Sequence, residues 1–182
     1  MKNLRLILII AIAIVGCKSP EPRRPVSIKT GSFIKESAER NKALNKIERQ
    51  QIETLIAGRF KDKDFLISEN GFWYHYNLKS KDDTITPKFG DQVVFNYDIL
   101  DLNGQPIYTS EELGVQDYLM DKEELFTGLR EGLKLMKAKE SLTFIFPSHM
   151  AFGYYGDENK IGTNVPLICN VTLNKITKNN ND

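Results

Sequence analysis

The sequence predicts an α+β fold, in which an antiparallel sheet wraps around one short helix and follows an N-terminal helical extension. Three observations lead to this prediction. Apolar and polar residues alternate in several short stretches, which is typical of half-buried strands. Residues 125–136 instead repeat apolar side chains at three- and four-residue steps, which indicates one helix face. Long polar loops separate these stretches, and this mixture favours an α+β arrangement.

Length and composition indicate one soluble domain with an extension. The chain has 182 residues, of which 41% are hydrophobic and 27% charged, both ordinary values for a globular protein. Its formal net charge of +1 gives no reason to expect a nucleic-acid partner.

Residues 1–16 have the pattern of a secretory signal peptide. Lys2 and Arg5 precede an apolar run from Leu6 to Val15, and Gly16 follows it as the small residue at the cleavage site. This run is too short for a membrane span of about 20 residues. The following Cys17 completes the sequence IVGC, which resembles a bacterial lipobox and implies a lipid on Cys17. Several acyl chains would anchor the domain firmly. The alternative is an ordinary cleaved signal with a chance cysteine.

Residues 17–30 are interpreted as the lipidated tether, because prolines alternate with charged residues there. Contact of Arg23 and Arg24 with anionic lipid headgroups is the alternative to a simple charged linker. Residues 31–60 form the predicted helical extension. Its apolar stripe is irregular, and its composition indicates a helix too polar for a core element. It is a spacer, a helix that docks on the domain or, less favoured, a helix that pairs with a partner.

Residues 61–85 are predicted to be leading strands. Asn70-Gly71 separates two short apolar stretches and indicates a hairpin. Phe72, Tyr74 and Tyr76 would share one face, for which core packing is favoured over a ligand platform.

The main domain is predicted over residues 86–177, with residues 178–182 as a polar tail. Its strands are expected over residues 92–101, 141–146 and 167–173, and the strand at 141–146 is expected to be half-buried. Residues 111–124 are interpreted as a charged excursion. Gly128 and Gly132, inside the predicted helix, suggest close approach to another backbone.

The sequence contains no phosphate loop, dinucleotide fingerprint or zinc-ligand spacing. His75 and His149 have no obvious catalytic partners. We therefore expect neither a cofactor nor a metal ion. Cys169 is the only cysteine after Cys17 and is expected to be a buried apolar residue.

The stretch LREGLKLMKAKESLTFIFPSHMAFG, residues 129–153, resembles the signature of FKBP-type peptidyl-prolyl cis-trans isomerases, and the resemblance extends over about half of the chain. Together with the lipobox, it is similar to the gliding-motility-associated FKBP-type lipoproteins of Bacteroidota. The resemblance implies an FKBP-like sheet around a short helix and a prolyl isomerase (rotamase). This reaction needs no titrating group, because a dry apolar pocket favours a twisted amide over a planar one.

The resemblance also implies the site residues. The expected catalytic residues are Tyr97, Phe126, whose backbone N–H would hold a substrate carbonyl, and Phe152. The expected substrate-binding residues are Ile107, Tyr108, Leu125, Leu129, Ile161 and Cys169. Five positions depart from the family pattern. Ile107 and Cys169 each stand where the family usually has a phenylalanine, Leu129 replaces a tryptophan, Tyr108 an aspartate and Phe152 a tyrosine.

The expected function is a lipid-anchored isomerase in the cell envelope, facing the periplasm from either membrane. It would assist folding of proline-containing polypeptide clients, with a link to gliding motility. The alternative is a weak or inactive FKBP-like chaperone or binding module that serves membrane-complex proteins. The loop at residues 154–164 either contacts a client or is a solvated surface loop.

Overall fold

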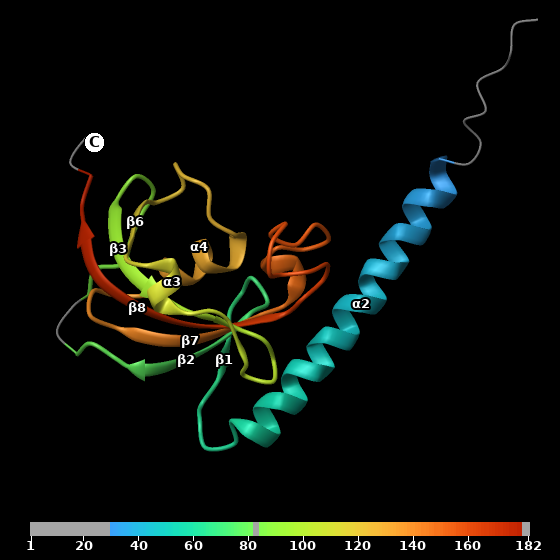
Figure 1. Cartoon of the computed structure of the whole chain (residues 1–182), viewed down its shortest axis with the longest axis horizontal. Helices are drawn as coiled ribbons and strands as arrows, with labels where there is room; N and C mark the ends of the chain where they lie inside the picture. Colours follow the sequence, from blue (N-terminus) through green and yellow to red (C-terminus); the bar gives the residue numbers. More distant parts are fainter. Residues whose placement is uncertain (1–29, 82–83, 180–182) are drawn as a thin grey trace, which may run out of the picture. The chain divides into compact units, whose positions relative to one another are not determined.

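The computed structural model describes residues 30–81 and 84–179 (Figure 1). The expected signal peptide, Cys17 and nearly all of the tether lie outside these residues. The helices and strands run in this order: α2 Thr30–Arg59, β1 Leu66–Ile67, β2 Trp73–Leu78, β3 Gln92–Tyr97, β4 Ile99–Leu100, β5 Pro106–Tyr108, α3 Ser110–Leu113, β6 Gln116–Leu119, α4 Thr127–Leu133, β7 Ser141–Phe146, η1 Ser148–Met150 and β8 Leu167–Thr177.

The chain divides into two compact units, Met1–Ala38 and Glu39–Asp182. In the first unit, the described residues form only the start of α2. No helix in the described ranges combines the length and the apolar character that crossing a membrane requires.

The second unit is built on one antiparallel sheet, as the sequence predicts. Its main path runs in the order β1-β2-β7-β8-β3-β6, and β4 pairs with both β5 and β8. The hairpin at Asn70-Gly71 joins β1 to β2, with Leu66 opposite Tyr74. Helix α4 lies within the curve of the sheet (Figure 1), and its buried Leu129 and Leu133 meet the inward face in the main core.

Two glycines let α4 lie close against the sheet and the following loop. A Cβ atom at Gly128 would be 2.5 Å from a ring carbon of Phe146 and 2.8 Å from the backbone oxygen of Met150. At Gly132 it would be 3.0 Å from the ring of Phe144. The expected close approach to backbone therefore holds at Gly128, whereas Gly132 approaches an aromatic side chain.

Strand β7 is buried on both faces, so the prediction of a half-buried strand is wrong. The outward-facing Ile145 is 0% exposed and packs with Trp73, Ile168 and Ile52 of α2 in a second apolar cluster. The part of α2 that follows Glu39 thus docks on the outer face of the sheet. The interpretation of the helix as too polar for a core element is wrong for this part, because a few apolar side chains suffice to cover the small cluster.

A buried carboxylate adds polar contacts to this docking. Glu48 and Ser148 are 2% and 1% exposed. Glu48 accepts hydrogen bonds from the backbone N–H of Ser148 at 2.8 Å and from its hydroxyl at 2.6 Å. Since Ser148 opens η1, this contact fixes helix α2 to the start of the long loop between β7 and β8.

Residues 111–124 contain more regular structure than the charged excursion predicted from the sequence. Helix α3 carries a capping box at Thr109, and β6 extends the sheet by pairing with β3, with Tyr118 opposite Val93. Tyr118 is buried. A four-residue edge strand is too short to produce a clear alternation in the sequence, and its pairing partner defines it.

Candidate active site

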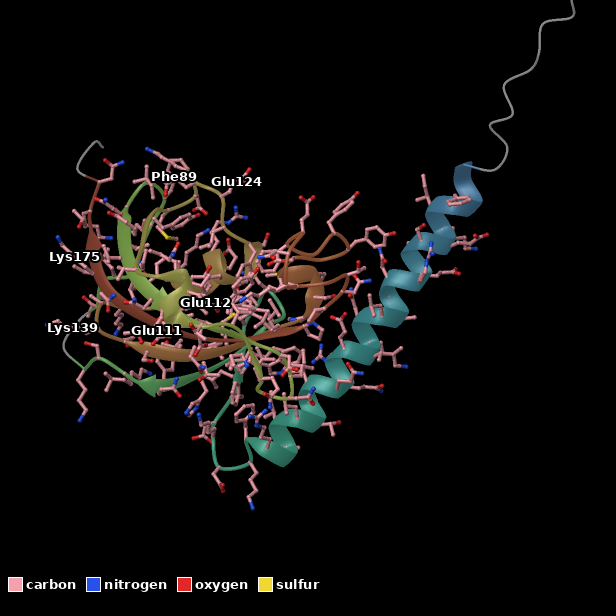
Figure 2. All side chains as sticks on the ribbon, in the orientation of Figure 1. Phe89, Glu111, Glu112, Glu124, Lys139 and Lys175 are labelled. Carbon is pink, nitrogen blue, oxygen red and sulfur yellow. The ribbon has the colours of Figure 1, made fainter. Side chains whose placement is uncertain are left out.

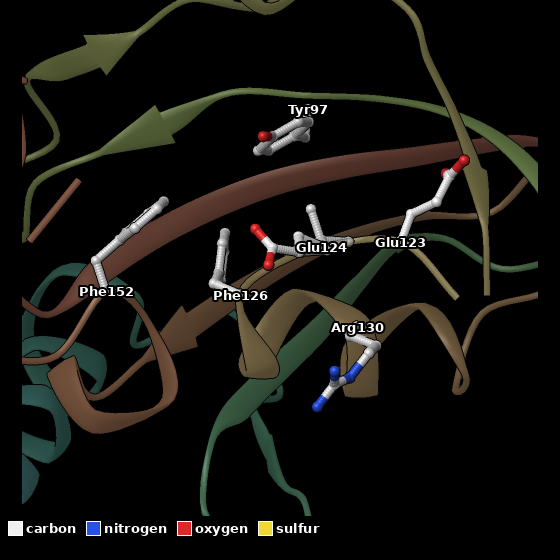
Figure 3. A pocket seen from close by; sticks show the side chains of 7 residues that line it. Tyr97, Glu123, Glu124, Phe126, Arg130 and Phe152 are labelled. Carbon is white, nitrogen blue, oxygen red and sulfur yellow. The ribbon is translucent and has the colours of Figure 1, made fainter. Parts of the chain in front are cut away.

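An open pocket of about 490 Å³ lies between the end of β3, the segment before α4 and the loop after η1. Figure 3 shows the side chains that line it. The lining residues are Tyr97, Glu123, Glu124, Leu125, Phe126, Arg130 and Phe152. Four of the sequence-predicted site residues, Tyr97, Leu125, Phe126 and Phe152, therefore converge on one hollow.

Phe126 forms one wall of the pocket. It is the N-cap of α4 and has an extended backbone, with φ −62° and ψ 145°. Its ring centroid lies 5.1 Å from that of Phe152 and 5.5 Å from that of Phe146. The helical pattern of the sequence includes Leu125 and Phe126, but the helix itself begins at Thr127. Among the described residues, no acceptor binds the N–H of Phe126, which leaves this donor available to a ligand.

Tyr97 ends β3 and contributes a phenol to the pocket. Pairing with Val171 places it on the inward face of the sheet, where it is 8% exposed. Burial raises its pKa to about 12, with smaller contributions from the neighbouring Cys169 and Tyr108. The hydroxyl is therefore protonated at neutral pH and can donate a hydrogen bond.

Phe152 reaches the pocket from the loop between β7 and β8. Backbone hydrogen bonds fix this part of the loop, from Gly153 N–H to the oxygen of Ser148 and from Asn164 N–H to the oxygen of Gly153. Since Ser148 is itself held by Glu48, the wall formed by Phe152 depends on a loop that is anchored at its start and at its end.

Ile107 and Tyr108 pack against the main core but do not line the pocket. The hydroxyl of Tyr108 donates to Asp157 and accepts from the side-chain amide of Asn159. The hydrogen bond to Asp157 raises the pKa of Tyr108. Lys160 lies over the Tyr108 ring, 4.6 Å from its centroid. Tyr108 thus holds the loop between β7 and β8 through its hydrogen bond to the carboxylate of Asp157.

The remaining three predicted substrate-binding residues lie in the core beside the pocket. Leu129 and Cys169 are 0% exposed and Ile161 is 3% exposed. Burial raises the pKa of the Cys169 thiol well above its usual value, so the thiol stays protonated, in agreement with the expected apolar role. None of the three contributes to the pocket wall.

The pocket is also lined by three charged residues that were not predicted from the sequence, namely Glu123, Glu124 and Arg130. The only available signal was the position of the two glutamates, directly before Leu125 and Phe126 in the sequence. Arg130 lies within the predicted helix, and nothing in the sequence shows that its side chain reaches the pocket.

Comparison with known families decides the class of the protein. The sequence model of the FKBP-type peptidyl-prolyl cis-trans isomerases matches residues 83–174, about half of the chain. The chain belongs to this family. The FKBP-type family and fold support isomerase activity, as the resemblance implies. No curated protein matches the sequence significantly.

Solved structures of FKBP-type and related proteins share the fold at low sequence identity. A peptidyl-prolyl cis-trans isomerase from Pseudomonas syringae pv. tomato has a TM-score of 0.60 at 17% identity, covering 75% of this chain and 96% of its own. FkpA from Escherichia coli has a TM-score of 0.57 at 22% identity, covering 97% and 83%. The N-terminal domain of FKBP42 from Arabidopsis thaliana has a TM-score of 0.57 at 16% identity, covering 64% and 94%.

Proposed function

We propose that this protein is a lipid-anchored prolyl isomerase that assists the folding of exported or envelope proteins. Its clients are proline-containing polypeptides. Slow isomerisation of X-Pro bonds can limit the rate at which such chains fold. Cys17 carries the lipid and holds the domain at the periplasmic face of a membrane of the cell envelope. The lipobox beside an FKBP-type domain also supports a link to gliding motility, with components of that machinery as partners.

The observation that carries the catalytic proposal is the convergence of Tyr97, Phe126 and Phe152 on one pocket. Rotation about a peptide bond has a barrier of about 18–20 kcal/mol, because it breaks amide resonance. A twisted amide has less charge separation than a planar one, so aromatic walls that exclude water favour it. The N–H of Phe126, to which no acceptor binds among residues 30–81 and 84–179, and the protonated hydroxyl of Tyr97 supply donors for the substrate carbonyls.

A binding module without turnover is the second candidate, and two observations favour it. Phe152 has no hydroxyl, so the pocket has one polar group fewer than the family pattern. Further along the same loop, Tyr154 and Tyr155 are 70% and 84% exposed, with ring centroids 5.4 Å apart. Exposed aromatic rings suit contact with an unfolded chain.

Isomerisation of a proline-containing tetrapeptide by the purified domain separates the two candidates. We expect the cis-to-trans rate to rise in proportion to protein concentration. A rate equal to that without protein, combined with suppressed aggregation of an unfolded test protein, would instead establish the binding module.

Replacing Cys17 with serine should abolish lipid attachment. A serine hydroxyl cannot form the thioether that holds the diacylglyceryl group, so we expect the Cys17→Ser protein to lose all incorporated radioactive palmitate and to leave the membrane fraction. The matched control is Cys169→Ala, which removes the other thiol and should keep both label and fractionation. Palmitate that persists in the Cys17→Ser protein would refute the anchor.

A further inference from the structure

The charges around the pocket do not cancel. Arg130 belongs to a four-residue network in which its Nε lies 3.4 Å from Asp121. In the same network, Lys134 lies 3.1 Å from Asp121 and 2.8 Å from Glu131. Two cations and two anions balance one another there. Glu123 and Glu124 lie outside this network, so their two negative charges remain at the pocket.

The two glutamates differ in their direction and in their partners. Glu123 accepts a hydrogen bond from the backbone N–H of Leu119 at 2.9 Å, and its side chain extends away from Phe126 (Figure 3). The carboxylate of Glu124 points toward the Phe126 ring in the same view. Within the described part of the chain, Glu124 has no hydrogen-bond donor and no basic partner. Its charge is therefore free to interact with a ligand in the pocket.

We propose that Glu124 selects substrates with a lysine or arginine next to the proline. This inference rests on the proposed isomerase function, because it assumes that the proline ring occupies the apolar part of the pocket. A side chain adjacent to the proline then passes the pocket edge where Glu124 lies. A carboxylate beside an aromatic wall attracts a cationic side chain and repels an acidic one, which produces a preference without altering the apolar walls.

The size of the preference follows from the exposure of Glu124. The side chain is exposed, and exposed ion pairs are weak and screened by salt. We expect peptides with lysine beside the proline to be preferred over leucine peptides by about three- to fivefold in kcat/KM at low ionic strength. Peptides with glutamate at that position should fall below both, and the preference should shrink as salt is added.

The test uses tetrapeptides with lysine, leucine or glutamate directly before or directly after the proline. Each is assayed with the wild-type protein, with Glu124→Gln and with Glu124→Lys. We expect the lysine preference to vanish in Glu124→Gln and to turn toward glutamate in Glu124→Lys. Glu111→Gln is the matched control, because Glu111 is an exposed glutamate of α3 outside the pocket, and Figure 2 shows it well apart from Glu124. It should leave the preference unchanged.

Peptide affinity, measured in parallel by fluorescence anisotropy, separates failure of this inference from failure of the proposed function. If no peptide is turned over, the isomerase proposal fails, while charge selection is still decided by the affinities. Equal turnover and equal affinity for lysine and leucine peptides would overturn the role of Glu124. A lysine preference that survives in Glu124→Gln would do the same.

Discussion

Replacing Phe126 with alanine is expected to lower kcat/KM for prolyl isomerisation by about tenfold to a hundredfold. The ring forms a wall of the pocket and packs against Phe152 and Phe146. Burying a side chain of this size is worth about 1.5–3 kcal/mol, and each 1.36 kcal/mol changes a rate tenfold. The backbone N–H is unaffected, so the tetrapeptide assay measures the loss of the wall alone.

Two further variants make this result interpretable. Phe126→Leu retains an aliphatic wall and should preserve most of the activity. Phe89→Ala removes an equally large ring that is 67% exposed and does not line the pocket, so it should leave the rate at the wild-type value. Circular dichroism of each variant checks that it is folded before its turnover is compared. A folded Phe126→Ala protein with wild-type turnover would show that the isomerase site lies elsewhere.

The second large effect is expected on stability, when Glu48 is replaced with alanine. Both oxygens of this buried carboxylate accept hydrogen bonds from Ser148. Hydrogen bonds to a charged group contribute about 1.5–3 kcal/mol, and a donor left without an acceptor in the interior costs its full desolvation. We expect the free energy of unfolding, measured by urea denaturation, to fall by about 3 kcal/mol, because the two contacts share one acceptor group.

Helix α2 itself provides the control for this measurement. Glu53 pairs with Arg49 on the exposed face of the same helix, with both side chains at least half exposed. An exposed pair four residues apart contributes about 0.3–0.5 kcal/mol, so Glu53→Ala should be nearly neutral. Equal destabilisation by Glu48→Ala and Glu53→Ala would mean that the contact with Ser148 does not hold the helix to the sheet.

Local patterns in the sequence predicted much of the sheet. Alternation predicted a strand over residues 92–101, where β3 and β4 lie, and Phe95 and Tyr97 of β3 are buried. Asn70-Gly71 indicated a hairpin, which β1 and β2 form. These predictions succeeded because strand alternation and turn chemistry depend on residues close together in the sequence.

The same kind of reasoning failed at the outer face of the sheet. Strand β7 alternates in sequence, but Ile145 is covered by a helix about 90 residues earlier in the chain. Glu48 lies 100 residues before Ser148, so neither residue shows in its own neighbourhood that it has a partner. A glutamate in a polar helix is normally solvated, and only its contacts identify it as buried.

The sequence by itself determined the antiparallel α+β fold, the short helix with its two glycines and the apolar residues Tyr97, Phe126 and Phe152, because short-range periodicity and a recognisable signature carry this information. Only the tertiary structure decided that these residues meet in one pocket and that α2 closes the outer face of the sheet through Ile52 and Glu48. It also decided that Glu124 lies at the pocket with no basic partner among the described residues. These contacts join segments that the sequence separates by tens of residues, and chain folding alone brings them together.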